Sequence, residues 1–207
     1  MEISQISLNA SFILYLIFLW PQIFHNWKHK ELHNLSLGFH FLLFFSYLAD
    51  LLFAFYQNMP WQYKTVSLIG LTCLLIQHFQ LKHYYKFNSR LNKLFDFSLI
   101  FTLIILLSSF FHLSQRQLTP KFLPIILGFI ANIGFVFYLI PQIIKNHLNN
   151  QKKAKSISLG FLILGFSINI LDLISAISLN WPIASKLGCL SSFLLKIILI
   201  IQYFKPK

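Results

Sequence analysis

Seven runs of mainly apolar residues, each about as long as a membrane is thick, dominate this 207-residue chain. A helix needs about 20 such residues to cross a hydrocarbon core of about 30 Å. The sequence is 57% hydrophobic and only 11% charged, which is more apolar than a typical soluble domain. Because a membrane offers the backbone no water, these runs predict an all-α membrane protein. The predicted helices cover residues 4–25, 37–57, 62–85, 94–114, 122–146, 157–179 and 183–204.

The basic residues are distributed unevenly over the predicted loops. Twelve of the 17 follow the first, third, fifth and seventh helices, and none precedes the first helix. Cytosolic loops carry an excess of Lys and Arg, so we expect the N-terminus in the periplasm or a lumen and the C-terminus in the cytosol. This distribution explains the net charge of +12 without a nucleic-acid partner. The short tails favour a bacterial inner membrane, with an endolysosomal membrane as the alternative.

A short motif occurs twice in the same register. A Pro-Gln pair at residues 21–22 recurs at 141–142, and Ser-Leu-Gly-Phe at 36–39 recurs at 158–161. Each copy lies in apolar surroundings, and an aspartate follows each one. A repeat that keeps its spacing over so many positions predicts a molecule built from two similar halves.

The repeat divides the chain into three parts. Residues 1–88 and 119–207 each hold three predicted helices, and residues 89–118 hold the fourth helix, which has no counterpart. Three helices end on the opposite side of the membrane, so one extra crossing restores the orientation of the second copy. The sequence thus predicts a 3+1+3 arrangement of two parallel three-helix bundles. A weaker echo aligns residues 75–79 with 200–204.

These motifs resemble those of the PQ-loop repeat proteins, a superfamily that includes cystinosin, the cationic amino acid exporters of lysosomes and vacuoles, and the SWEET sugar transporters. The resemblance covers nearly the whole chain apart from the fourth helix. It implies an alternating-access transporter in which each Pro-Gln proline bends its helix and the halves rock around a central site. The order of Asn169 before Asp172 is the reverse of the acid-then-Asn pattern in the cationic amino acid branch. SWEET proteins lack paired acids at these positions.

The two prolines are predicted to be hinges. A proline inside a helix removes one backbone hydrogen bond and clashes with the preceding turn. Pro21 and Pro141 therefore bend their helices, with a static kink as the alternative to a moving hinge. The neighbouring Gln22 and Gln142 either bond the carbonyls that the prolines leave free or line the pathway.

Two aspartates are predicted within the hydrocarbon layer. Asp50 and Asp172 each lie 12 residues after the glycine of the repeated motif, roughly 18 Å along a helix. An ionisable residue at that depth is costly unless it faces protein or water, so it is a candidate for proton or substrate binding. The alternative is a buried structural acid bonded to Asn169, to Tyr47 or to a backbone donor.

Lys196 and Asn132 are further candidates. Lys196 lies inside the last predicted helix, and its side chain either extends to the membrane surface or faces the central cavity, where it can pair with an acid or bind a carboxylate. Asn132 either lines the path or bonds two helices together.

We therefore expect transport of a small polar solute, an amino acid or related metabolite, coupled to protons. A SWEET-like sugar uniporter and a non-transporting receptor like the KDEL receptor, which shares this architecture, are the alternatives. The sequence has no nucleophile–base constellation, metal-ligand cluster or phosphate-binding loop, so we expect no enzyme activity, metal or cofactor. Homo-oligomers are compatible with this sequence.

Overall fold

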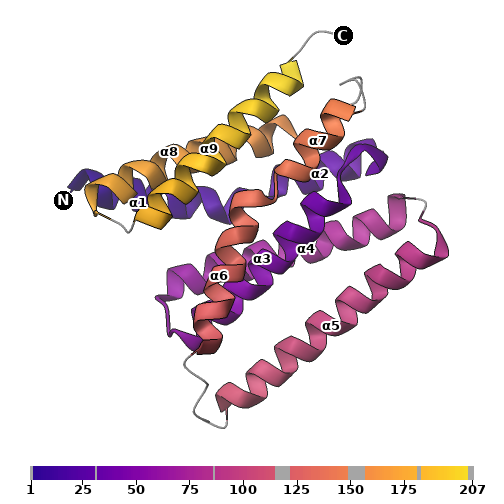
Figure 1. Cartoon of the computed structure of the whole chain (residues 1–207), viewed down its shortest axis with the longest axis horizontal. Helices are drawn as coiled ribbons and strands as arrows, with labels where there is room; N and C mark the ends of the chain where they lie inside the picture. The colour runs from indigo at the N-terminus through magenta and orange to yellow at the C-terminus, as the bar shows by residue number, and fades with distance from the viewer. Residues whose placement is uncertain are drawn as a thin grey trace.

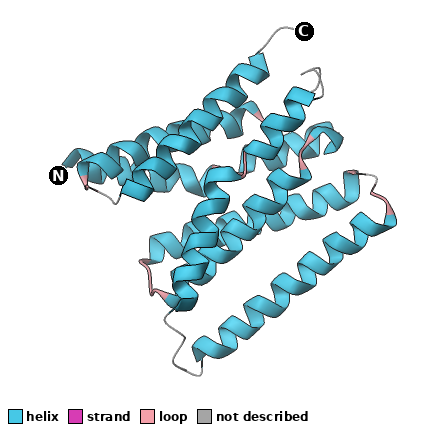
Figure 2. Cartoon of the chain, viewed as in Figure 1, coloured by secondary structure: helices cyan, strands magenta, loops and turns pink. Residues whose placement is uncertain are grey.

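The chain is helical through nearly all the residues that the computed structural model describes, which are 2–30, 32–85, 87–114, 122–148, 157–180 and 183–204 (Figure 2). No β-strand occurs within these ranges, so the predicted all-α class is confirmed for them. The elements are α1 (Glu2–Ile17), α2 (Trp20–His29), the 3-10 turn η1 (Leu32–Asn34), α3 (Leu37–Tyr56), α4 (Trp61–Tyr84), α5 (Ser89–Ser114), α6 (Phe122–Phe137), α7 (Ile140–Leu148), α8 (Leu159–Ser178) and α9 (Ile183–Phe204).

Among the described residues, six helical segments are long and apolar enough to cross a membrane. They are Ile3–His29, Leu37–Tyr56, Ser89–Phe111, Phe122–Leu148, Leu159–Ser178 and Lys186–Phe204. The seventh predicted crossing, residues 62–85, forms α4, which has 24 residues but is not one of the six. Polar residues make α4 less apolar than the others. Two of them, Gln77 and His78, are buried against neighbouring helices instead of facing lipid.

The first and fifth predicted crossings are each broken into two helices. α1 gives way to α2 at residues 18–19, and α6 gives way to α7 at residues 138–139. Pro21 and Pro141 are the second residues of the new helices. Proline is tolerated there because the first turn of a helix has no partner for the missing N–H. The predicted bends are thus present as matched helix breaks.

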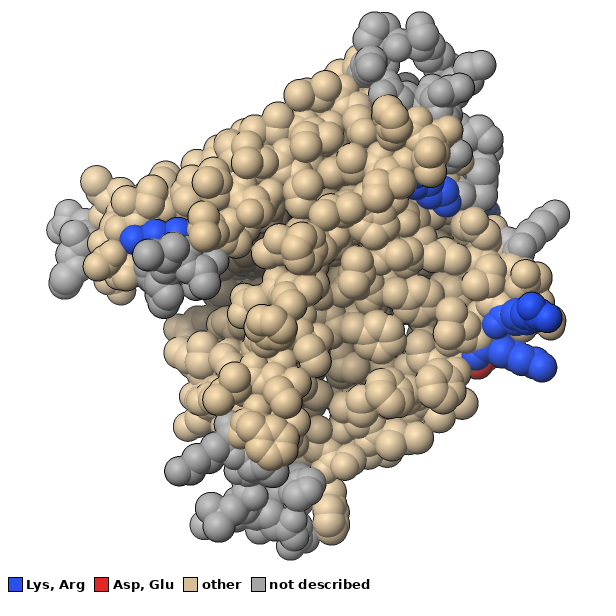
Figure 3. Space-filling model, in the orientation of Figure 1, with Lys and Arg blue, Asp and Glu red and all other residues tan. Residues whose placement is uncertain are grey.

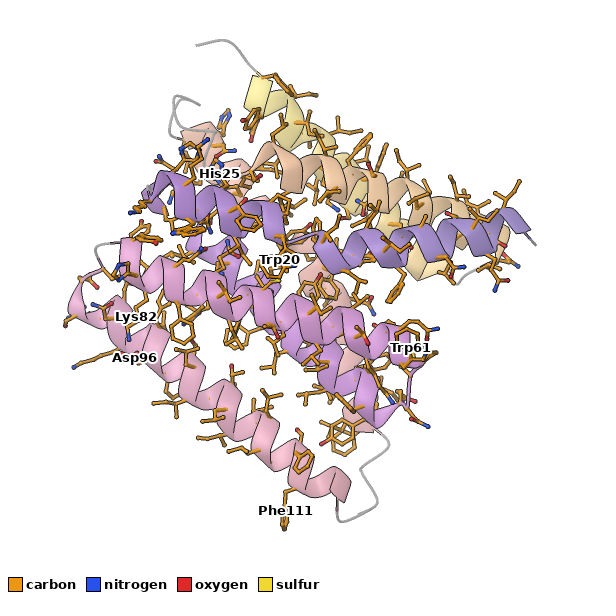
Figure 4. All side chains as sticks on the ribbon, turned by 180° about the vertical axis from the view of Figure 1, so that it is seen from behind. Trp20, His25, Trp61, Lys82, Asp96 and Phe111 are labelled. Atoms are coloured by element: carbon orange, nitrogen blue, oxygen red, sulfur yellow. The ribbon has the colours of Figure 1, made fainter. Side chains whose placement is uncertain are left out.

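The long helices form a closed ring in the order α1, α4, α3, α6, α9 and α8, with α8 packing again on α1. The tightest contacts between the sequence repeats are those of α1 with α8 and of α3 with α6. Outside the ring, α5 packs lightly on α3 and α4 (Figure 1). An ion pair between Lys82 and Asp96 joins α5 to α4 (Figure 4).

The ring is divided into two arms. Figure 1 shows α1, α8 and α9 leaning away from α3, α4 and α6 towards the end where the N-terminus lies. At the other end, the short helices α2 and α7 lie between the arms, and each contacts both of them. We call this the PQ end, because both helices begin around a Pro-Gln pair, and the opposite end the distal end. Figure 3 shows a hollow in the surface between the arms at the distal end. The described charged side chains that are visible lie towards the margins of this face of the molecule.

Small residues allow the close approach of α3 and α6. A Cβ atom built on Gly134 of α6 would overlap Ser46 Oγ of α3, and one on Gly128 would lie 3.1 Å from the Phe53 ring. Small residues serve this purpose widely in membrane helices, where van der Waals packing drives association. This pair of helices, one from each repeat, is therefore a tightly fitted unit.

Part of the charge pattern falls outside the described residues. Of the basic residues used to predict the orientation in the membrane, those not described are Lys86, Arg116, Lys121, Lys152, Lys153, Lys155, Lys205 and Lys207. The predicted boundary between residues 118 and 119 also lies outside them, whereas the boundary at 88–89 falls between α4 and α5.

Candidate functional site

At the PQ end, each motif glutamine bonds to the other sequence repeat. Gln22 Oε1 accepts a hydrogen bond from the Ser158 N–H at 2.8 Å, and Gln142 Oε1 accepts one from the Ser36 N–H at 2.6 Å. The two serines directly precede α8 and α3. The first N–H groups of a helix have no partner within it, and the glutamines supply two such partners. Both glutamines thus reach across the repeats instead of towards the carbonyls freed by their own prolines.

The glutamines are held by a chain of side-chain amides. Gln22 Nε2 donates to Asn26 Oδ1 at 2.7 Å, and Asn26 Nδ2 donates to Gln80 Oε1 of α4 at 3.1 Å. Gln80 Nε2 then donates to the carbonyl of Ile23 at 3.0 Å. Every amide in the chain is therefore both oriented and bonded.

The same chain occurs in the second repeat. Gln142 donates to Asn146 at 2.7 Å, Asn146 donates to Gln202 of α9 at 3.1 Å, and Gln202 donates to the carbonyl of Ile143 at 3.3 Å. We call these two bonded sets together the PQ clamp. Gln202 therefore matches Gln80, three residues beyond the Gln77 that the sequence echo aligned with it.

The glycine of each Ser-Leu-Gly motif makes room for the proline of the other repeat. A Cβ atom on Gly38 would lie 3.0 Å from Pro141 Cβ, and one on Gly160 would lie 3.1 Å from Pro21 Cβ. This mutual contact explains why the two motifs occur together. Sequence reasoning missed Asn26 and its counterparts as clamp residues, although the repetition of an Asn four residues after each motif glutamine carried the signal.

Asp172 lies where α8 packs on α1. Its Oδ2 accepts a hydrogen bond from Tyr15 Oη at 2.6 Å, with Ser11 beside it. One turn further along α1, Ser7 Oγ donates to the carbonyl of Leu171 at 2.6 Å. The side chain is buried, with 8% of Asp172 exposed. The acid of the second repeat is therefore held by a helix of the first.

Asp50 has a different environment. Its carboxylate accepts hydrogen bonds from Ser67 Oγ at 2.5 Å and from Tyr63 Oη, both on α4 of its own repeat. Two hydroxyls thus engage its two oxygens, whereas Asp172 is bonded from the other repeat. Neither acid has Asn169 or Tyr47 as the hydrogen-bond partner that the structural alternative named. Tyr47 instead packs its ring over Gly70 of α4, where a Cβ atom would overlap that ring.

Lys196 is buried in the second repeat. Its Nζ atom donates to Asn169 Oδ1 at 3.0 Å and to the Gly165 carbonyl at 2.9 Å, and the residue is 3% exposed. The alternative in which it extends to the membrane surface is therefore wrong. Gly165 leaves room for the Lys196 side chain, since a Cβ atom on Gly165 would lie 2.8 Å from Lys196 Cε and 2.7 Å from the Phe18 ring.

Three candidate residues of the second repeat come together. Asn169 and Asp172 are one turn apart on α8, and Lys196 is bonded to Asn169. Among the described residues, Asn169 Nδ2 is buried without a hydrogen-bond partner. The site therefore combines an acid, an ammonium group and an unused amide donor.

The remaining candidates lie in the other arm. Tyr47 is buried with its ring 5.0 Å from Phe135, in an edge-to-face arrangement. Asn132 of α6 is exposed and donates to the Gly128 carbonyl of its own helix at 2.8 Å. Neither residue contacts the cluster of Asn169, Asp172 and Lys196.

The fold and the reciprocal clamp define a helical membrane protein whose two copies of one motif complete each other. The PQ loop repeat model matches residues 3–63 and 123–185, which together make up more than half of the chain. The chain belongs to the PQ-loop repeat family. Both Pro-Gln pairs, both Ser-Leu-Gly motifs and both aspartates lie within the matched segments. A search of curated proteins finds no match.

Proposed function

We propose that this chain is an alternating-access transporter of a small polar solute. The observation that carries the proposal is the difference between the two ends of the molecule. At the PQ end hydrogen bonds join the two repeats, while at the distal end the arms separate. A solute site between the arms would be open to one side of the membrane and closed to the other. Membership of the PQ-loop repeat family supports membrane transport.

We further propose the 3+1+3 arrangement, with α4 as the seventh crossing and α5 as the linker helix. The matched clamp supports two repeats in parallel orientation, since both Pro-Gln pairs lie at the same end. The position of α5 outside the ring fits a helix that only restores orientation. Because this extra crossing restores the orientation of the second copy, the two repeats are parallel and not inverted.

In this mechanism, the breaks before Pro21 and Pro141 are the hinges. Each break separates a long distal helix from a short helix that is held by the clamp. Bending there lets the arms move while Gln22 and Gln142 keep α2 and α7 seated on the second helices of the opposite repeats. Discontinuous helices serve the same purpose in other transporter folds.

The proposed solute and proton site is the cluster of Asp172, Asn169 and Lys196. Lys196 and the free amide donor of Asn169 suit a carboxylate, and Asp172 suits an ammonium group or a proton. An amino acid carries both groups, so it is the solute class that this cluster fits best. Asp50 is a second protonatable group, but its two hydroxyl partners favour a role in holding α3 to α4. Tyr47 and Asn132 are proposed to line the pathway from the other arm.

The PQ end is proposed to face the cytosol. The described basic residues at this end are Lys28, Lys30, Lys82, Arg90, Lys93 and Lys145, while Lys64 and Lys186 lie at the distal end. This excess supports the orientation through the positive-inside rule. A bacterial inner membrane is the proposed location, with an endolysosomal membrane as the alternative.

Uptake into proteoliposomes tests the proposal. Radiolabelled amino acids and sugars are offered to the purified protein with and without an imposed pH gradient. We expect amino acid uptake driven by the gradient, and we expect Asp172→Asn to abolish that dependence. Asp96→Asn is the matched control, because Asp96 is an exposed acid on α5, away from the cluster.

Other outcomes identify other functions. Sugar uptake without proton movement would support a uniporter, and solute binding without flux would support a receptor. Gradient-independent amino acid uptake that survives Asp172→Asn would overturn the proton coupling.

A further inference from the structure

The ring of long helices has an approximate two-fold symmetry. Each contact between two of its helices recurs between their counterparts: α1–α8 with α6–α3, α1–α4 with α6–α9, and α3–α4 with α8–α9. Counterparts are 120 positions apart in α1 and α6, as Pro21 and Pro141 are, and 122 apart in the other ring helices, as Asp50 and Asp172 are. A residue that borders the space between the arms in one repeat therefore has a counterpart that borders it from the opposite side.

The two aspartates occupy equivalent positions, but they are bonded differently. Asp50 accepts hydrogen bonds from two hydroxyl groups of α4, in its own repeat. Asp172 accepts one from Tyr15 of α1, in the other repeat. The counterpart of Tyr15 is Phe135, which has no hydroxyl group and packs edge-to-face against the Tyr47 ring at 5.0 Å. The acid of the first repeat is therefore engaged by its own repeat, and the acid of the second repeat by the other one.

The other two members of the candidate cluster have apolar or aromatic counterparts. Lys196 corresponds to Leu74, and Asn169 corresponds to Tyr47. Leu74 is fully buried, and 4% of Tyr47 is exposed. The ammonium and amide groups of the second repeat are thus matched by an aliphatic side chain and an aromatic ring in the first. We call Tyr47 and Phe135 together the aromatic wall, because they offer the site rings where the second repeat offers polar groups.

The buried charges limit the charge of a solute. Among the described residues, the buried side chains of the Asp, Glu, Lys and Arg types are those of Asp50, Asp172 and Lys196. Asp50 is engaged by α4, which leaves one acid and one base for a solute. The ammonium and carboxylate groups that all amino acids share can pair with both. A further charge on the solute side chain would be buried without a partner, which is strongly unfavourable.

We propose that the solute is an amino acid whose side chain is uncharged and apolar, and that the aromatic wall receives this side chain while Lys196 and Asp172 bind the carboxylate and ammonium groups. This inference rests on the proposed function, because it names the solute of that site. The second repeat holds the part that all amino acids share, and the first repeat selects among side chains. A polar side chain would lose its hydration against the wall, and a charged one would also lack a partner.

Binding to the purified protein in detergent tests the solute class without any transport. Leucine, phenylalanine, alanine, asparagine, lysine and glutamate are titrated separately by isothermal calorimetry. Leucine and phenylalanine should bind about tenfold or more tightly than alanine, because only their longer side chains reach the wall. Asparagine is close to leucine in shape, so the difference between them reports polarity. Asparagine and the two charged amino acids should bind about tenfold or more weakly than leucine.

Substitutions in the wall should change the preference among side chains and leave the binding of the shared groups intact. Phe135→Ala and Tyr47→Asn should each lower the affinity for leucine about tenfold or more, while the affinity for alanine is unchanged. Tyr47→Phe should behave like the unsubstituted protein, since it keeps the ring. Phe44→Ala is the matched control, because Phe44 is also buried on α3 but packs on His40 and His78.

A purely structural role of the two rings gives a different result. Loss of packing alone would weaken the binding of leucine and alanine equally, and such equal weakening would overturn the wall. Should Tyr47→Asn fail to fold, Phe135→Ala still decides the question, because the ratio of the two affinities is measured within one variant. Tighter binding of lysine, glutamate or a sugar than of leucine, or no binding of any amino acid, would overturn the proposed solute class.

Flux measurements separate this inference from the proposed function. Radiolabelled leucine and lysine are offered to the same protein in proteoliposomes. Selective binding of leucine without any uptake would overturn the transporter and leave the solute class standing. Uptake of lysine with no preference for leucine would support transport and overturn the solute class. Selective binding together with selective uptake of leucine would support both.

Discussion

At the scale of single residues, two glycines decide what their neighbours can do. Gly165 has no side chain where the Phe18 ring and the Lys196 stem lie, so a lysine can be buried inside the bundle. Gly188 lies on α9, and a Cβ atom built on it would be 3.8 Å from its nearest neighbour, Val136 Cγ2, which is ordinary contact distance. The two positions therefore predict opposite responses to the same substitution.

We expect Gly165→Ala to lower the free energy of unfolding by about 1–3 kcal/mol, because the new methyl group overpacks Phe18 and Lys196. Gly188→Ala should instead leave stability unchanged or raise it by about 0.4–1 kcal/mol, since alanine restricts the unfolded chain. Thermal unfolding of both variants in detergent measures the difference. Equal melting temperatures would contradict the packing around Gly165.

Lys196→Met should separate stability from binding. Methionine keeps the length of the side chain and removes a buried charge, so the melting temperature should hold or rise. Amino acid affinity should fall about tenfold or more, because a hydrogen bond to a charged group contributes about 1.5–3 kcal/mol. Lys64→Met is the control, since Lys64 bonds Asn58 at the distal end. A loss of affinity in both variants would argue against a local role for Lys196.

At the scale of elements, the two broken helices and the linker helix α5 have contrasting attachments. α2 and α7 are tied to two arms each by amides, whereas α5 is joined to α4 by the partly exposed pair of Lys82 and Asp96 and, separately, by the buried bond from His78 to the Phe95 carbonyl. Exposed ion pairs contribute little to stability. The clamp should therefore be sensitive to substitution, and the α5 ion pair tolerant of it.

Lys82→Ala should lower the free energy of unfolding by less than about 1 kcal/mol, since both side chains of the ion pair face solvent in part, and solvent screens their attraction. Solute uptake should be unchanged. Unfolding and uptake measured on the same preparation check this. A large loss of either would show that α5 is coupled to the arms.

Pro21→Ala should slow transport with little loss of stability. Alanine keeps the Cβ contact with Gly160 but lets the backbone continue as a helix, so the break before α2 becomes stiffer. We expect roughly a fivefold or greater fall in the uptake rate, as is common for hinge residues. Pro141→Ala should act alike in the matched position. Faster uptake in either variant would contradict the hinge.

At the scale of the whole molecule, the sequence predicted the membrane helices better than it predicted the contacts between them. Apolar runs located the six described helices that are long and apolar enough to cross a membrane, because the bilayer sets the length of such helices, and the prolines located the breaks. The residue of the first repeat that is equivalent to Gln202 was predicted wrongly. The echo at residues 75–79 followed residue identity and pointed to Gln77, whereas the equivalent residue in the structure is Gln80, which lies where α2 and α4 meet. The bond from Tyr15 to Asp172 joins residues far apart in the chain, and no local pattern marks it.

The two repeats should assemble when they are made as separate chains. Residues 1–118 and 119–207, expressed together, should co-purify and show gradient-driven uptake, because the Gln22–Ser158 and Gln142–Ser36 bonds and the α1–α8 and α3–α6 contacts form only between them. Gln22→Leu with Gln142→Leu should weaken the recovery of the complex. Either fragment expressed alone should be lost or recovered as an aggregate. Two fragments that are each stable alone and do not bind each other would contradict the close packing between the repeats.

The mutual seating of each proline on the other repeat's glycine also bears on how such a chain can change over generations. The glycine that each proline packs against belongs to the other copy of the motif, so Pro21 is constrained by Gly160 and Pro141 by Gly38. After a duplication, copies of a gene usually drift apart freely. Here each copy preserves the other, and divergence is left to positions such as Lys196 and Tyr15, where the halves have already become different.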